Sequence, residues 1–135
     1  MNTRYLRVKK SRLPGAGKGL FTTRPIKKGE YIVEYKGRIC SWKEVKHEDG
    51  YNGYLMFLST RTVIDARPAL NTYGRYANDA RGLVRVKGLR NNSAYVQAGR
   101  KCFIEATRNI LAGEEILVHY GDAFWRLQDK LARQK

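Results

Sequence analysis

Three glycines alternate with other residues near the start of the chain, in the segment GAGKG at residues 15–19. Because glycine has no side chain, such a segment lets the main chain approach a ligand closely and offer it bare amide and carbonyl groups. The spacing fits neither the phosphate loop, in which Gly-Lys precedes Ser or Thr, nor the Gly-x-Gly-x-x-Gly of dinucleotide folds. Taken alone, residues 15–19 predict either a ligand-binding loop or a glycine-rich hairpin turn.

Two later segments carry polar and aromatic side chains where regular structure is interrupted. Residues 74–80 read GRYANDA, in which Arg75 and Asn78 could form a buried polar knot or contact a polar ligand. Residues 112–122 read AGEEILVHYGD, which predicts a turn, a strand and a break at Tyr-Gly. Taken alone, Tyr120 would simply end that strand with its hydroxyl in water.

The elements that must position these segments are short. Nearly all β-like runs have four to six residues and end at Gly, Pro, Asn or Ser, which favours a mostly β domain with a few short helices. The expected strands are residues 5–8, 20–22, 30–35, 54–58, 62–65, 94–97, 101–106 and 115–119. The sequence SWKE at residues 41–44 has the form of a helix capping box, and the helical spacing of Phe124, Leu127 and Leu131 predicts a C-terminal helix over residues 122–134.

Length and charge limit the function classes. The 135 residues fit one compact domain, expected over residues 1–135, and a hydrophobic content of 42% is ample for its core. The 27 Lys and Arg against 12 Asp and Glu give a net charge of +15, which attracts polyanions such as nucleic acid. No apolar run approaches the ~20 residues of a membrane span, and residues 1–12 lack the apolar part of a signal peptide. We therefore expect an intracellular protein, in nucleus or cytoplasm, without membrane contact.

Two cysteines, Cys40 and Cys102, stand alone, without a Cys-x-x-Cys pair and with only His47 and His119 to join them. This pattern argues against a structural zinc site and predicts two buried or idle thiols. No metal is expected.

The order and spacing of the motifs resemble the SET-domain family, which transfers methyl groups from S-adenosylmethionine to lysine side chains of proteins. Residues 15–21 resemble its Gly-x-Gly-x-Gly cofactor loop, and residues 31–37 (YIVEYKG) resemble its Glu-Tyr-x-Gly strand. Residues 75–78 (RYAN) are similar to its Arg-Phe-x-Asn, and residues 104–121 to its ending in Gly-Glu-Glu and Tyr-Gly. The resemblance covers nearly the whole chain. It implies small curved β sheets with a C-terminal pseudoknot, closed by the C-terminal helix because the cysteine-rich, zinc-binding flanks of many relatives are missing.

The resemblance also implies roles for particular residues. It makes Tyr120 the catalytic tyrosine at the end of a lysine channel, with Tyr35 and Tyr95 as its aromatic walls. The small Val118 stands where relatives carry larger residues that limit the number of methyl groups, so dimethylation or trimethylation is sterically allowed. The residues implied to bind S-adenosylmethionine are Gly17, Lys18, Gly19, Leu20, Arg75, Asn78, Asp79, Phe124 and Trp125.

Asp79 departs from the family pattern, in which a histidine usually follows the asparagine. This departure leaves two hypotheses open. The first is an active protein-lysine methyltransferase, acting on a histone or another chromatin or nucleic-acid-associated protein. The second is a catalytically impaired SET-like module that binds nucleic acid or chromatin through its basic surface. Glu44, Glu48 and Asp49 are candidate contacts for a basic substrate, and a homodimer that completes the substrate groove is an open alternative.

Overall fold

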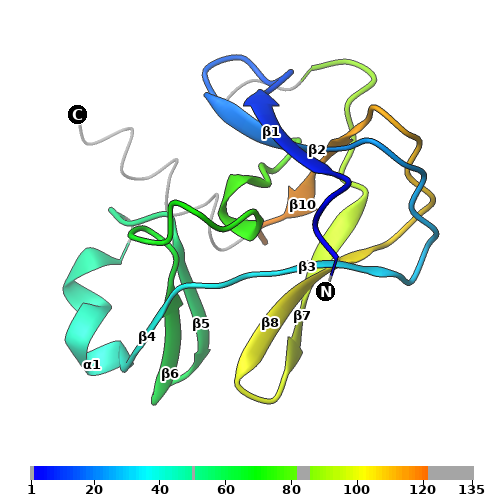
Figure 1. Cartoon of the computed structure of the whole chain (residues 1–135). Coiled ribbons are helices and arrows are strands. Elements are labelled where there is room, and N and C mark those ends of the chain that lie inside the picture. Colours follow the sequence, from blue (N-terminus) through cyan, green and yellow to red (C-terminus); the bar gives the residue numbers. More distant parts are fainter. Residues whose placement is uncertain (1, 50, 82–85, 122–135) are drawn as a thin grey trace.

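The computed structural model describes residues 2–49, 51–81 and 86–121, which form three small β sheets and three short helical turns (Figure 1). The first sheet has the strand order β1-β2-β9, the second β10-β7-β8-β3 and the third β4-β6-β5. The strands are β1 (Leu6–Lys10), β2 (Lys18–Thr22), β3 (Tyr31–Glu34), β4 (Arg38–Cys40), β5 (Leu55–Ser59), β6 (Thr62–Asp65), β7 (Ser93–Ala98), β8 (Lys101–Ala106), β9 (Glu115–Ile116) and β10 (Val118–His119). The helical turns are α1 (Trp42–Val45), η1 (Lys46–Glu48) and η2 (Gly74–Tyr76). The mostly β architecture predicted from the sequence is confirmed.

The main hydrophobic core joins the first and second sheets. Its members come from strands of both sheets and are almost completely buried: Leu6, Leu20, Ile32, Ile104, Ile116 and Val118. Burying an aliphatic side chain of this size contributes about 1.5–3 kcal/mol. The cluster therefore holds β2 firmly, and with it the glycine-containing connection that precedes this strand.

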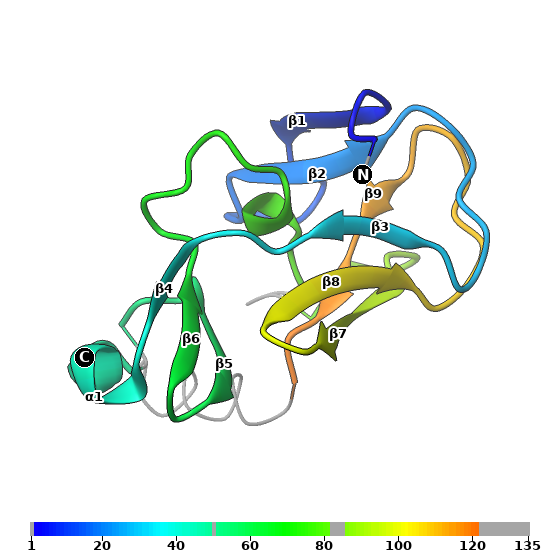
Figure 2. The same ribbon diagram turned by 60° about the horizontal axis from the view of Figure 1, so that its bottom comes forward.

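The third sheet stands apart from the other two, as the rotated view shows (Figure 2). Its outer side packs on α1 through Cys40, Val45 and Val63. Its inner side meets the β7–β8 hairpin, where Tyr35 and Cys102 are buried together. Tyr35 therefore lies at the junction of the second and third sheets.

The C-terminal part of the described chain passes between two earlier segments. The amide of Val118 donates to the carbonyl oxygen of Asn78 at 2.8 Å. On the other side, the amide of Leu117 donates to Oδ1 of Asn92 at 3.0 Å. Residues 115–120 are thus bonded on one side to residues 77–79 and on the other to residues 92–93. This crossing corresponds to the pseudoknot that the family resemblance implied.

The structure differs from the sequence-based expectation in two strands. Residues 115–119 form two strands rather than one, because the chain leaves the first sheet after Ile116 and joins β7 of the second sheet in parallel at Val118. Strand β4 was not expected, since its three residues are too few to show a pattern. The predicted capping box is confirmed, with Ser41 Oγ accepting from the Glu44 amide and Glu44 accepting from the Ser41 amide. The predicted helix over 122–134 lies outside the described residues.

Candidate active site

Segments far apart in the sequence meet around one cavity of about 480 Å³. Its lining residues come from the β1–β2 connection, the segment before β5, η2 and the end of β10: Ala16, Gly17, Lys18, Gly53, Tyr54, Arg75, Tyr76, Asn78 and Tyr120. Gly17, Lys18, Arg75, Asn78 and Tyr120 were expected from the sequence. The structure therefore brings three separate motifs to one place.

The glycine segment is shaped by close contacts on both of its sides. Gly17 has a φ of +69°, a conformation that L side chains rarely adopt, and its carbonyl oxygen accepts from the amide of Ser11 at 2.8 Å. A side chain at Gly19 would overlap the carboxylate of Glu115. That buried carboxylate accepts from Ser11 Oγ at 2.6 Å and from the Arg12 amide at 2.9 Å. Glycine at position 19 thus leaves room for the carboxylate that holds the loop.

Arg75 carries a guanidinium group into the cavity between two aromatic rings. It lies 4.4 Å from the ring centroid of Tyr54 and 5.2 Å from that of Tyr76. Its Nε and Nη1 atoms are buried, and no hydrogen-bond partner for either exists in the described part of the chain. An unsatisfied buried donor costs about 1–3 kcal/mol, and more when it is charged. A carboxylate bound in the cavity would satisfy this group, because carboxylates accept paired N–H bonds from guanidinium.

Three tyrosines form a row that leads away from the cavity. The ring of Tyr120 stacks on that of Tyr95 at 6.3 Å, and Tyr95 meets Tyr35 edge to face at 5.6 Å. The hydroxyl of Tyr120 donates to the carbonyl oxygen of Ala77 at 2.8 Å, and that of Tyr35 donates to the carbonyl oxygen of Tyr54 at 2.7 Å. Burial raises the pKa of all three tyrosines. The row therefore presents neutral hydroxyls and apolar ring faces.

The raised tyrosine pKa values predict how stability depends on pH. A free tyrosine titrates near pH ~10, and the folded chain holds these protons more tightly, so their contribution is present below pH ~10 and is lost as the pH rises above it. We expect thermal unfolding experiments on the wild type to show a Tm that falls above pH ~10. The fall should be shallower in Tyr120→Phe, which removes one raised pKa. The two proteins differ only at position 120, so identical slopes would contradict the prediction.

Asp79 is turned into the crossing of the chain rather than into the 480 Å³ cavity. Its residue surface is only 2% exposed. Oδ2 accepts from the amide of Tyr120 at 2.9 Å, and Oδ1 accepts from the amide of Arg81 and from Asn91 Nδ2, each at 2.9 Å. The carboxylate also borders a neighbouring cavity of about 400 Å³ beside His119 and Asn91. The structure therefore gives this side chain polar partners within the fold.

The other expected site residues lie elsewhere. Leu20 and Val118 are fully buried in the main core and do not line the cavity, although Tyr95 and Tyr120 pack against the same cluster. The roles given to these two residues stay predictions. Gly19 contributes through the loop contact with Glu115, and Phe124 and Trp125 lie outside the described residues.

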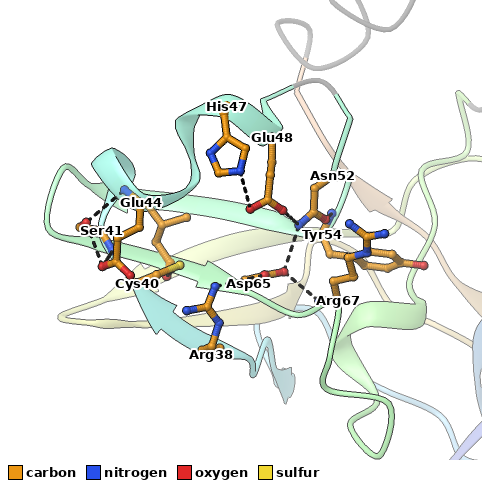
Figure 3. Close-up of polar contacts among 11 residues, drawn as sticks. Arg38, Cys40, Ser41, Glu44, His47, Glu48, Asn52, Tyr54, Asp65 and Arg67 are labelled. Atoms are coloured by element: carbon orange, nitrogen blue, oxygen red, sulfur yellow. Dashed lines mark hydrogen bonds and ion pairs between the residues drawn. The ribbon is translucent and has the colours of Figure 1, made fainter.

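Two of the acidic residues proposed to contact a substrate, Glu44 and Glu48, bond to other side chains around α1 and η1 (Figure 3). Glu44 bonds to Ser41 in the capping box. Glu48 accepts from Asn52 Nδ2 at 3.0 Å and lies 3.7 Å from His47 Nε2. Neither Glu44, Glu48 nor Asp49 lines the cavity, so their contact with a substrate stays a prediction.

Tyr54 and Tyr76 are site residues that sequence reasoning missed. Tyr76 directly follows Arg75, so its place in the RYAN segment was the available signal. Tyr54 belonged to an expected strand, and only the packing of the third sheet against the cavity brings it beside Arg75. No sequence spacing encodes that approach.

Metal-ligand clusters and membrane-spanning helices are both absent from the residues that the structure describes. Within residues 2–49, 51–81 and 86–121, no group of three or more His, Cys, Asp or Glu side chains is arranged to hold a metal ion. Across the same residues, the helices are all too short or too polar to cross a membrane.

Comparisons with curated proteins match most of the chain. N-lysine methyltransferase KMT5A-A of Danio rerio is 31% identical over 121 residues, covering 82% of this chain and 34% of that protein. Histone-lysine N-methyltransferase EZH2 of Chaetomium thermophilum is 31% identical over 137 residues, covering 93% of this chain and 9% of that protein. The chain thus spans about a third or less of the length of these relatives.

A solved structure and a family model match the same region. The methyltransferase domain of human PR domain-containing protein 2 superposes with a TM-score of 0.63 at 24% identity, covering 87% of this chain and 77% of that one, and so shares the fold. The family model described as SET domain matches residues 17–121, which include Gly17–Gly19 of the glycine loop, Arg75 and Tyr120. The chain belongs to the SET domain family.

Proposed function

We propose that this domain transfers a methyl group from S-adenosylmethionine to lysine side chains of a protein substrate. The observation that carries the proposal is the meeting of the Gly17–Lys18 loop, the unsatisfied Arg75 guanidinium and the Tyr120 hydroxyl around one cavity. The names of the relatives as lysine methyltransferases support it.

The cavity residues fit the polar end of S-adenosylmethionine. Arg75 would donate hydrogen bonds to its carboxylate, since the buried Nε and Nη1 form no hydrogen bond to any described residue. The Lys18 carbonyl and the Asn78 amide oxygen would face its ammonium group. In this structure Asn78 Nδ2 donates to the Lys18 carbonyl at 2.9 Å, which joins the two segments that form this wall.

The chemistry needs alignment and a neutral amine. When bound, S-adenosylmethionine supplies a methyl group on a positively charged sulfur, and the lysine nitrogen forms its new bond to carbon as the carbon–sulfur bond breaks to leave a neutral thioether. Lysine titrates near pH ~10.4, so holding it neutral at pH ~8 costs about 3 kcal/mol. The buried rings of Tyr35, Tyr95 and Tyr120 lower this cost, because desolvation disfavours the ammonium form. The amine loses its proton to solvent before transfer.

Tyr120 would orient the amine rather than act as a base. Burial, and next the nearby Asp79 charge, raise the pKa of its hydroxyl, so it stays protonated. Its hydroxyl hydrogen is directed to the carbonyl oxygen of Ala77. An N–H of the substrate amine would therefore bond to the oxygen of this neutral hydroxyl.

Methyl incorporation tests the proposal. Purified protein would be incubated with S-adenosylmethionine carrying a labelled methyl group and with histones and other lysine-containing proteins, while calorimetry measures binding of S-adenosylhomocysteine. Label in a protein substrate together with cofactor binding is expected. Mass spectra of the product also count the methyl groups, and the small Val118 predicts dimethylated or trimethylated lysine. Cofactor binding without label on any substrate would favour the impaired module, for which the comparisons offer no support.

The substrate partner is a protein that presents a lysine. Whether a second copy of the chain completes the groove is decided by light scattering on the purified protein, where a monomer would remove the homodimer hypothesis.

A nucleic-acid contact is favoured by the position of the positive charge. Residues 2–29 contain nine Lys and Arg and no acidic residue. Strand β1 lies at the edge of the first sheet and exposes Arg7, Lys9 and Lys10. Because phosphates attract such a row, this edge would dock nucleic acid that accompanies the substrate.

Salt titration tests this docking edge. Replacing Lys9 and Lys10 with glutamine should lower the slope of log K against log salt for duplex DNA by about two, because each lost phosphate contact removes about 0.9. Fluorescence anisotropy measures the slope. Lys43→Gln with Lys46→Gln is the matched control, since these exposed residues carry the same charge on α1 and η1, at the third sheet. Equal slopes for both double variants would contradict the docking edge.

A further inference from the structure

Asp79 makes the contacts of a side chain that fixes the backbone around it. Its carboxylate accepts the amide of Arg81, two residues later, and the side-chain Nδ2 of Asn91. Asn91 in turn accepts the amide of Ala80 at 2.8 Å through Oδ1. These bonds close the loop of residues 79–81 against residue 91.

Asp65, at the end of β6, has the same local arrangement, which gives an internal comparison (Figure 3). Its Oδ1 accepts the amide of Arg67, again two residues later, at 3.0 Å, and Asn52 Nδ2 at 3.2 Å. Both carboxylates are buried, at 5% exposure for Asp65 and 2% for Asp79. Each is therefore an aspartate that orders a turn with the help of an asparagine from another segment.

The two sites differ at the second carboxylate oxygen, which in Asp79 also lies 4.0 Å from His119 Nδ1. Asp79 also accepts the backbone amide of Tyr120 at 2.9 Å through Oδ2. The corresponding oxygen of Asp65 instead faces Arg38 Nη2 at 3.9 Å. The Asp79 carboxylate is thus bonded directly to the backbone of Tyr120, whereas the Asp65 turn is tied to Tyr54 through Asn52 and Ala66.

Residues 77–79 consequently hold Tyr120 at both of its ends. The hydroxyl donates to the carbonyl oxygen of Ala77 and the amide donates to Asp79. Because a tyrosine side chain has only two rotatable angles, fixing its backbone and its hydroxyl fixes the ring. The position of the hydroxyl in the cavity then depends on the loop that carries Asn78.

We infer that Asp79 is a positioning residue for methyl transfer: its carboxylate fixes the backbone of Tyr120, in place of the histidine that the family usually carries, and its side chain does not bind the cofactor. The inference rests on the proposed function. It gives the Asp79 side chain a role in the alignment of the reacting groups, while the assignment of Asp79 to the cofactor set stays a prediction.

Asp79→Asn tests the inference, because it keeps the shape and replaces one accepting oxygen with a donor that faces N–H groups. We expect kcat to fall about 10- to 100-fold, because small displacements of reacting groups lower the rate by factors of this size. The affinity for S-adenosylhomocysteine, measured by calorimetry, should stay at the wild-type value. Exchanging the pair, as Asp79→Asn with Asn91→Asp, restores a donor–acceptor match between the two side chains and should recover part of kcat.

Asp65→Asn is the matched control for lost stability. It makes the same chemical change in the same type of turn, so it should lower Tm as Asp79→Asn does while leaving kcat near the wild-type value. If Asp79→Asn weakens cofactor binding and keeps kcat, the side chain is a cofactor ligand. If the two variants have the same kcat, Asp79 is only structural. Either result overturns the inference.

Amide hydrogen exchange separates this inference from the proposed function. Loss of the Asp79 acceptor should speed exchange at the Tyr120 amide in Asp79→Asn and not in Asp65→Asn, whether or not the wild type is active. An inactive wild type with this exchange pattern would defeat the proposed function alone. An active wild type with unchanged exchange in Asp79→Asn would defeat the positioning role alone.

Discussion

Replacing Tyr120 with phenylalanine is expected to lower kcat for lysine methylation about 100-fold, the size of loss that follows when reacting groups are misaligned. Phenylalanine keeps the stack on Tyr95 but removes the hydroxyl that bonds to Ala77 and would orient the amine. The lost hydrogen bond lowers the free energy of unfolding by only about 0.5–1.5 kcal/mol. The variant should therefore stay folded and bind S-adenosylhomocysteine with nearly unchanged affinity.

Tyr31→Phe is the control for this variant. Tyr31 is 44% exposed, stacks on Phe103 and does not line the cavity, so the same loss of a hydroxyl should leave kcat unchanged. Steady-state kinetics with saturating cofactor measure the effect. Equal kcat values for Tyr120→Phe and the wild type would remove Tyr120 from the catalytic role.

Arg75→Met is expected to weaken cofactor binding without lowering the stability of the ligand-free protein. Hydrogen bonds to a charged group contribute about 1.5–3 kcal/mol, so losing the partner of the cofactor carboxylate should weaken its binding about 10- to 150-fold. The protein without ligand should not lose stability, because its buried Nε and Nη1 have no partner in the described chain and methionine removes that cost. Calorimetry and thermal unfolding measure the two effects separately.

Arg61→Met controls for the loss of one positive charge. Arg61 is exposed in the turn between β5 and β6, remote from the cavity lining. The Arg61→Met variant should change neither the affinity for the cofactor nor Tm. If Arg75→Met lowered the stability but left the cofactor affinity unchanged, the guanidinium would stabilise the fold through its contacts with Tyr54 and Tyr76 and would not bind the cofactor.

Much of the fold could be predicted because its signals are local. Gly, Pro, Asn and Ser mark the ends of most strands, and the capping box of α1 lies within four residues. The split between β9 and β10 is not local. It depends on Asn78 and Asn92 bonding to the chain on either side of Leu117, which no pattern within residues 115–119 encodes.

The residues of the site could be predicted where they belong to motifs that follow one another in the same order as in the family. Gly17, Lys18, Arg75, Asn78 and Tyr120 were found because the motifs that contain them follow one another as in the family, and they meet at the cavity. The place of Tyr54 in the cavity was missed because it depends on how the third sheet packs, which no sequence motif shows. The contacts of the Asp79 side chain within the fold were not predicted, because a loop sequence does not tell which way a side chain points.

The central claim is that this cavity delivers a methyl group to lysine, and peptide mapping of the reaction product by mass spectrometry tests it most directly. The account predicts a methyl mass increment on a lysine of the protein substrate after incubation with the wild type and S-adenosylmethionine, and its loss with Tyr120→Phe. An increment on another residue type, an increment of equal extent with Tyr120→Phe, or no increment on any substrate despite cofactor binding would contradict it.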